Sequence, residues 1–76
     1  MNNKKYFNIV LDYSIKKGII SNEAKNNITE NYAPIEENAP IYKFKNAIFC
    51  AYCDDVIELH EQEILLYLLD FKNFIV

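Results

Sequence analysis

Two prolines decide how this chain divides. Pro34 and Pro40 bracket residues 33–40. A proline cannot donate a backbone hydrogen bond, and it disfavours the α conformation in the residue before it. We therefore expect residues 33–40 to be a linker that no helix crosses. Because the chain has only 76 residues, we expect one small domain spanning residues 1–76, in which the parts before and after the linker pack together.

The part before the linker, residues 4–32, has the pattern of a helical hairpin. Apolar side chains recur at intervals of three and four residues over residues 4–17, which predicts an amphipathic helix. Gly18 is the only glycine of the chain, and it stands where a helix end favours the left-handed conformation. Ser21 is a suitable N-cap for a second helix, which we expect to end near Tyr32.

The part after the linker, residues 41–76, is harder to assign. Residues 41–45 alternate like a short strand. Residues 47–53 then form an unbroken apolar run, which fits either a buried helix or a strand. We favour a helix in this region, with Asn46 as a candidate N-cap, and keep a strand as the alternative.

Residues 55–72 predict a long C-terminal helix. Asp55 and Glu58 are spaced as in a capping box at its N-terminus. Its second half is apolar nearly all round, as in a helix that lies centrally or at an interface. The predicted fold is therefore mainly α, with a helical hairpin, a long C-terminal helix and at most a short β element at residues 41–53. The alternative is an α+β fold whose small sheet combines residues 41–53 with residues 73–76.

The apolar content is high for so short a chain. Apolar residues make up 51% of it and aromatic residues 14%. A domain of this size buries only about 60% of the surface that its unfolded chain exposes, and large apolar patches left at a surface usually mark contacts. We therefore expect a homo-oligomer, a protein partner, or both.

Composition also bears on the source and the location of the protein. Its eight basic residues are all lysines, and eleven acids bring the net charge to −3. Five residue types with codons rich in A and T (Asn, Lys, Ile, Tyr and Phe) supply 40 residues, as in genomes of low GC content, their phages and their mobile elements. The chain has no signal-peptide pattern and no apolar run long enough to span a membrane. We therefore expect a small acidic protein of the cytoplasm.

Cys50 and Cys53 are the sharpest candidates for chemistry. Thiols at this spacing bind zinc in zinc knuckles, and His60 together with a nearby acid would complete a tetrahedral site. A structural zinc site usually has a second Cys or His pair, and this chain has none. We therefore favour two buried free cysteines that act as small hydrophobic residues, and we expect no metal or other cofactor. A small zinc-binding module using these three residues is the alternative.

Residues 54–63 carry five acids and no lysine. Acids gather at helix N-termini because of the helix dipole, which explains the stretch without any function. The alternative is a negative surface that attracts a basic partner, for example a nucleic-acid-binding protein. The contact residues expected for such a partner are four of these acids and three aromatic residues nearby in the sequence: Asp54, Asp55, Glu58, Glu61, Tyr42, Phe44 and Tyr52.

The chain has no motif that would make it an enzyme, such as a glycine-rich phosphate loop or a nucleophile elbow. The helical hairpin also allows a helix-turn-helix interpretation, with residues 21–32 as the recognition helix. Lys25 is the only cation of that helix, whereas phosphate contacts supply most DNA affinity. The favoured function is a small non-catalytic protein-binding module, an inhibitor from a phage or mobile element that blocks a host protein such as a defence nuclease. A DNA-binding regulator is a further alternative.

Overall fold

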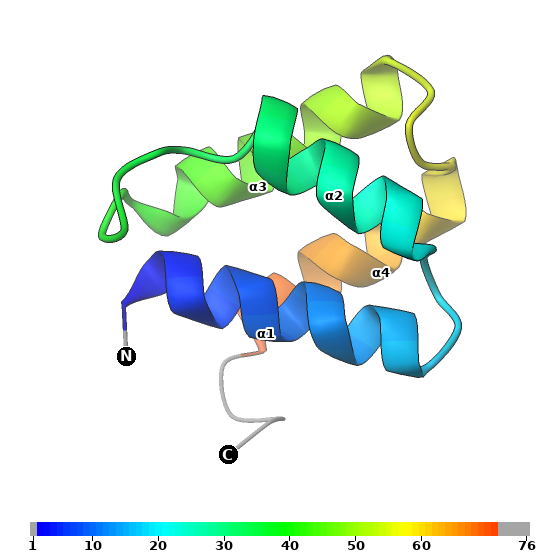
Figure 1. Cartoon of the computed structure of the whole chain (residues 1–76), viewed down its shortest axis with the longest axis horizontal. Coiled ribbons are helices and arrows are strands. Elements are labelled where there is room, and N and C mark those ends of the chain that lie inside the picture. Colours follow the sequence, from blue (N-terminus) through cyan, green and yellow to red (C-terminus); the bar gives the residue numbers. More distant parts are fainter. Residues whose placement is uncertain (1, 72–76) are drawn as a thin grey trace.

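The computed structural model describes residues 2–71 and places four helices in this range (Figure 1). The helices are α1 (Asn3–Lys16), α2 (Asn22–Asn31), α3 (Ile41–Cys53) and α4 (Leu59–Asp70). Each helix runs roughly opposite to the one before it (Figure 1). The mainly α fold is thus confirmed. No helix in the described range is long and apolar enough to cross a lipid bilayer.

The ambiguous region after the linker is a helix. α3 begins directly after Pro40 and extends to Cys53, so the strand alternative for residues 41–53 is wrong. Asn46 lies inside this helix and does not cap it, because the helix already starts at the residue that follows the proline. The other half of the alternative sheet, residues 73–76, lies outside the described residues.

The C-terminal helix starts later than the sequence pattern predicts. Asp55 is not its N-cap, because the residue adopts φ 62° and belongs to the end of α3. Its N–H donates to the Tyr52 carbonyl at 3.1 Å, and the Val56 N–H donates to the Ala51 carbonyl at 2.9 Å. This pair of bonds is a Schellman motif, which satisfies the last carbonyls of a helix.

The first residue of α4 is Leu59, and its N-cap is Glu58. The Glu58 N–H donates to Oε1 of Glu61 at 2.7 Å, and the two residues form a capping box. A capping box satisfies N–H groups that the first turn of a helix leaves without partners. The sequence pattern therefore identified the right motif but placed it three residues too early.

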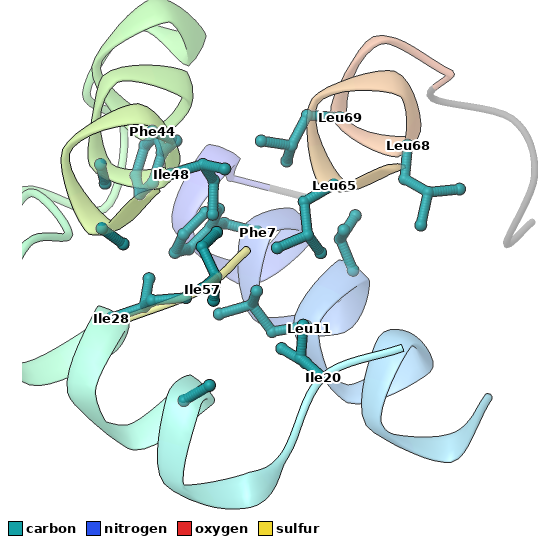
Figure 2. Packing of buried hydrophobic residues seen from close by; sticks show 14 of the residues in the cluster. Phe7, Leu11, Ile20, Ile28, Phe44, Ile48, Ile57, Leu65, Leu68 and Leu69 are labelled. Carbon is teal, nitrogen blue, oxygen red and sulfur yellow. The ribbon is translucent and has the colours of Figure 1, made fainter. Parts of the chain in front are cut away.

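Side chains from all four helices meet in one apolar core (Figure 2). Phe7 of α1 and Phe44 of α3 are fully buried, with ring centroids 5.0 Å apart and ring planes at 44°. Ile28 of α2 and Leu65 of α4 are also fully buried. Each such side chain contributes about 1.5–3 kcal/mol relative to leaving it exposed, so this cluster provides most of what holds the four helices together.

The linker is fixed to the start of α1. The Lys4 N–H donates to the Glu37 carbonyl at 2.8 Å, and Nδ2 of Asn3 donates to the Ala39 carbonyl at 2.9 Å. The N-cap of α1 is Asn2, whose Oδ1 accepts the Lys5 N–H at 2.7 Å. The middle of the chain thereby completes the N-terminal turn of the first helix.

Polar contacts also join helices that are distant in sequence. The Tyr6 hydroxyl donates to the Leu68 carbonyl at 2.8 Å and ties α1 to the last turn of α4. Lys25 of α2 pairs with Asp12 of α1, and Lys45 of α3 pairs with Asp70 of α4. The second ion pair places the start of α3 beside the end of α4, as expected for two antiparallel neighbours.

Candidate functional site

The turn between α3 and α4 meets the first turn of α2 at an acidic corner of the molecule. A shallow hollow of about 350 Å³ lies between the two segments. The residues that line it are Ser21, Glu23, Ala24, Asn27, Asp54, Asp55 and Val56. All three of its ionisable side chains are acids, and each of them is exposed. We use the name acidic corner for Glu23, Asp54, Asp55, Glu58 and Glu61.

The acids of this corner differ from Asp12 and Asp70 in their pairing, and they share the lack of a lysine partner within residues 2–71 with Glu30, Glu36, Glu37 and Glu63. Asp12 and Asp70 are neutralised by lysines, whereas no acid of the corner has a lysine partner among residues 2–71. The whole chain has eleven acids and eight lysines. Five of the acids lie in residues 54–63, so the remaining residues carry more lysines than acids. The negative charge is therefore concentrated at one end of α3 and the beginning of α4.

The Schellman motif and the capping box fix the backbone that carries these carboxylates. Asp54 is the C-cap of α3, and its Oδ2 accepts the hydroxyl of Tyr32 at 2.6 Å. This hydrogen bond to Asp54 raises the pKa of Tyr32 above its ordinary value of 10.0, and desolvation adds to the effect. The bond also joins the acidic turn to the C-terminal end of α2.

One group of possible metal ligands lies within the described residues. Ligand atoms of Glu58, His60 and Glu61 all lie within 4.8 Å of one another, and His60 Nδ1 is 3.8 Å from Oε2 of Glu58. Oε1 of Glu61 already accepts the Glu58 N–H. Neither Cys50 nor Cys53 belongs to this group. The structure thus brings His60 together with two acids and not with the two cysteines predicted as its zinc-binding partners.

The two cysteines lie on the surface. Cys50 and Cys53 are free thiols and both are exposed, so the expectation that they are buried is wrong. The buried positions of α3 are Phe44, Ala47, Ile48 and Ala51. The core thus takes the opposite side of this apolar helix and leaves both thiols in solvent.

The three predicted aromatic contact residues have different positions. Tyr42 is 58% exposed and is available to a partner. Tyr52 is half-buried against the core. Phe44 is fully buried, and its prediction as a contact residue is wrong because it packs on Phe7 at the centre of the molecule.

Several exposed apolar side chains were not among the predicted contact residues. Phe49 of α3 is 52% exposed. On α4 and directly after it, the exposed apolar residues are Leu59, Ile64, Tyr67 and Phe71. The rings of Tyr67 and Phe71 stack, with centroids 5.8 Å apart. Helical spacing from Phe44 and Ile48 would have placed Phe49 on the outer side of α3, once those two residues were assigned to the core.

The candidate DNA-recognition helix offers no free positive charge. Its single cation, Lys25, is held by Asp12 of α1. Glu23 at its first turn also lines the acidic hollow. Because lysines and arginines supply most of the electrostatic affinity for phosphates, this helix is poorly suited to DNA.

Comparison with known proteins gives no relationship. The chain matches no protein-family model, no curated protein and no solved structure.

Proposed function

We propose that this domain is a non-catalytic protein-binding module whose acidic corner binds a basic surface of another protein. The observation that supports it most is that three exposed carboxylates, those of Asp54, Asp55 and Glu58, gather on one well-anchored turn without a lysine partner among residues 2–71. The exposed Glu23 of α2 lies beside this turn. The hollow between Glu23, Asp54 and Asp55 has room for a lysine or arginine head group. Charge-assisted hydrogen bonds from such a group to carboxylates are shorter and stronger than neutral ones.

Nucleic-acid-binding proteins provide basic surfaces of this kind. An acidic domain that occupies a nucleic-acid groove would act as an inhibitor by competing with phosphates for the same lysines and arginines. Together with the AT-rich codon bias of the composition, this leads us to propose a phage or mobile-element inhibitor of a host protein such as a defence nuclease. The proposal requires no catalytic group in this chain.

The test compares two triple variants with the same change in charge. The first neutralises the acidic corner with Asp54→Asn, Asp55→Asn and Glu58→Gln. The matched control neutralises three exposed acids elsewhere, with Glu30→Gln, Glu36→Gln and Glu37→Gln. Both variants raise the net charge from −3 by the same amount. Amide replacements keep the side-chain shape, and Asn is tolerated in the left-handed conformation at position 55.

The tagged protein is used to capture its partner from a host lysate, and the affinity of the purified pair is measured at several salt concentrations. We expect the acidic-corner variant to bind about tenfold or more weakly at low salt and to show a reduced salt dependence, because surface charges steer and stabilise association. The control variant should bind like the unmodified protein. Equal binding by the two variants, or a lysate that yields no stoichiometric protein partner, would contradict the proposal.

A further inference from the structure

The outward side of α3 is unusual for a solvent-exposed helix face. Its exposed residues are Tyr42, Lys43, Asn46, Phe49, Cys50 and Cys53, and we call this set the α3 face. Only Lys43 among them carries a charge. The solvent side of a surface helix normally carries charged and polar residues. An apolar outward side is typical of a helix that contacts another molecule.

The α3 face cannot turn inward to hide these side chains. Tyr42, Asn46, Phe49 and Cys53 follow one another at intervals of four, three and four residues, so they form one stripe along the helix. The buried residues Phe44, Ile48 and Ala51 occupy the opposite side. Rotation of α3 to cover Tyr42 or Phe49 would expose Phe44, which packs on Phe7.

We propose that the α3 face packs against the α3 face of a second copy of this chain, with the two helices antiparallel across a two-fold axis. The side chains at the two ends of α3 carry opposite charges. Lys43 lies near the N-terminal end, and Asp54 directly follows the last residue of the helix. An antiparallel pair therefore brings each Lys43 next to the Asp54 of the other copy, whereas a parallel pair would bring like charges together.

The shapes along the stripe match in the same arrangement. A two-fold axis through the middle of the stripe places Tyr42 opposite Cys53, and Asn46 opposite Phe49. Each large ring thus meets a smaller side chain, which lets two helices approach closely. In a two-fold dimer every contact occurs twice. The antiparallel helix dipoles also place each positive end beside a negative end.

The size of the α3 face sets the strength of the dimer. A helix of 13 residues is about 20 Å long, and one face of it buries less than the roughly 800 Å² per partner of a standard interface. We therefore expect a weak dimer that forms reversibly as the protein concentration rises. The inference goes beyond the proposed binding of a basic partner, and the purified protein is sufficient to test it.

The first test is sedimentation of the purified protein from about 10 μM to 1 mM, a range in which weak dimers dissociate. We expect a monomer–dimer equilibrium that Phe49→Lys weakens at least tenfold. Tyr67→Lys is the matched control, because Tyr67 is also an exposed ring, at 63%, but lies on α4 and outside the α3 face, and it should leave the equilibrium unchanged. A monomer at every concentration, or equal behaviour of the two variants, would overturn the proposal.

The second test checks the antiparallel pairing by exchanging charges. Lys43→Asp and Asp54→Lys should each prevent the dimer of the single variant, because like charges then face each other twice. An equimolar mixture of the two variants should recover the dimer, since both ion pairs are restored in the mixed dimer. Failure of the mixture to dimerise would overturn the antiparallel arrangement.

The thiols provide a third measurement on the unmodified protein. Cys50 and Cys53 are exposed in the single chain and become covered in the proposed dimer. Their rate of reaction with a maleimide, followed per thiol, should therefore fall several-fold between about 10 μM and 1 mM. An unchanged rate in samples that sediment as dimers would place the interface elsewhere and overturn the proposal.

Discussion

At the scale of single residues, Asp55 has the most unusual conformation in the molecule. Its φ of 62° is the only positive value outside glycine in residues 2–71. Gly18 occupies the equivalent place at the end of α1, with φ 73° and the same pair of backbone bonds. Glycine adopts this conformation without a Cβ penalty, whereas other residues do so at some cost. The protein with aspartate at position 55 is therefore less stable than it would be with glycine there. In exchange, the aspartate adds a carboxylate to the acidic corner.

Asp55→Gly should raise the stability of the protein and at the same time weaken its binding to a basic partner. We expect the variant to raise the free energy of unfolding by about 0.5–1 kcal/mol, because glycine relieves the Cβ penalty. Binding of a basic partner should weaken, because one carboxylate is lost. Urea denaturation measures the first effect and titration with the partner the second. Asp55→Asn is the control, with stability close to the original and weakened binding; a glycine variant that is less stable would refute this account of the turn.

At the scale of helices, one buried hydroxyl adds a hydrogen bond to the apolar packing between α1 and α4. The Leu68 carbonyl accepts the Tyr6 hydroxyl at 2.8 Å and the Phe71 N–H at 3.1 Å. The last carbonyls of a helix lack partners within the helix, so Tyr6 supplies a donor at the end of α4. Tyr6 itself is only 8% exposed, and its ring belongs to the core.

Tyr6→Phe should loosen this attachment without disturbing the packing of the ring. We expect a loss of about 1 kcal/mol in the free energy of unfolding, the usual contribution of one hydrogen bond. The loss is limited because the Phe71 N–H still satisfies the Leu68 carbonyl. Urea denaturation gives the value, and hydrogen exchange in α4 should become faster. Tyr67→Phe, at an exposed position outside the α3 face, serves as the control and should change stability by less than about 0.5 kcal/mol; equal losses in both variants would contradict the role of the bond.

The helices were largely predictable from local patterns, and their ends and outward faces were less so. Gly18 and Ser21 marked the first turn correctly, because each chemical type fits one position of a helix end. Asp55 was predicted as an N-cap, because aspartate before an apolar run favours that position, but it ends the preceding helix instead. Within α3, almost every residue is apolar. The sequence therefore did not show whether Phe44 or Phe49 faces the core, which only packing against the other helices decides.

At the scale of the whole molecule, two tyrosines make the stability of the fold pH-dependent in the alkaline range. Burial, and to a smaller extent Asp70, raises the pKa of Tyr6, and the hydrogen bond to Asp54 raises that of Tyr32. Both hydroxyls donate hydrogen bonds only when protonated. A group whose pKa is higher in the folded than in the unfolded state contributes fully to the free energy of unfolding at pH values below its pKa in the unfolded chain. That contribution is lost as the pH rises through the folded pKa.

The free energy of unfolding should therefore decline as the pH rises above 10, the ordinary pKa of these two groups. Chemical denaturation between about pH 8 and 11 measures this decline. Lysines also titrate in this range, so the decisive comparison is with the double variant Tyr6→Phe and Tyr32→Phe. The double variant should start from a lower stability and lose less of it with pH. Parallel curves for the two proteins would show that the tyrosines do not cause the effect.

The bonds from the linker to α1 have a consequence for synthesis on the ribosome. The first helix leaves the ribosome before the carbonyls of Glu37 and Ala39, which complete its N-terminal turn. Phe7 likewise emerges well before Phe44, the ring that covers it. The early part of the nascent chain therefore exposes an apolar stripe while translation continues, and it reaches its final structure only after α3 and α4 have been made. Transiently exposed apolar surface of this kind favours aggregation until the core closes.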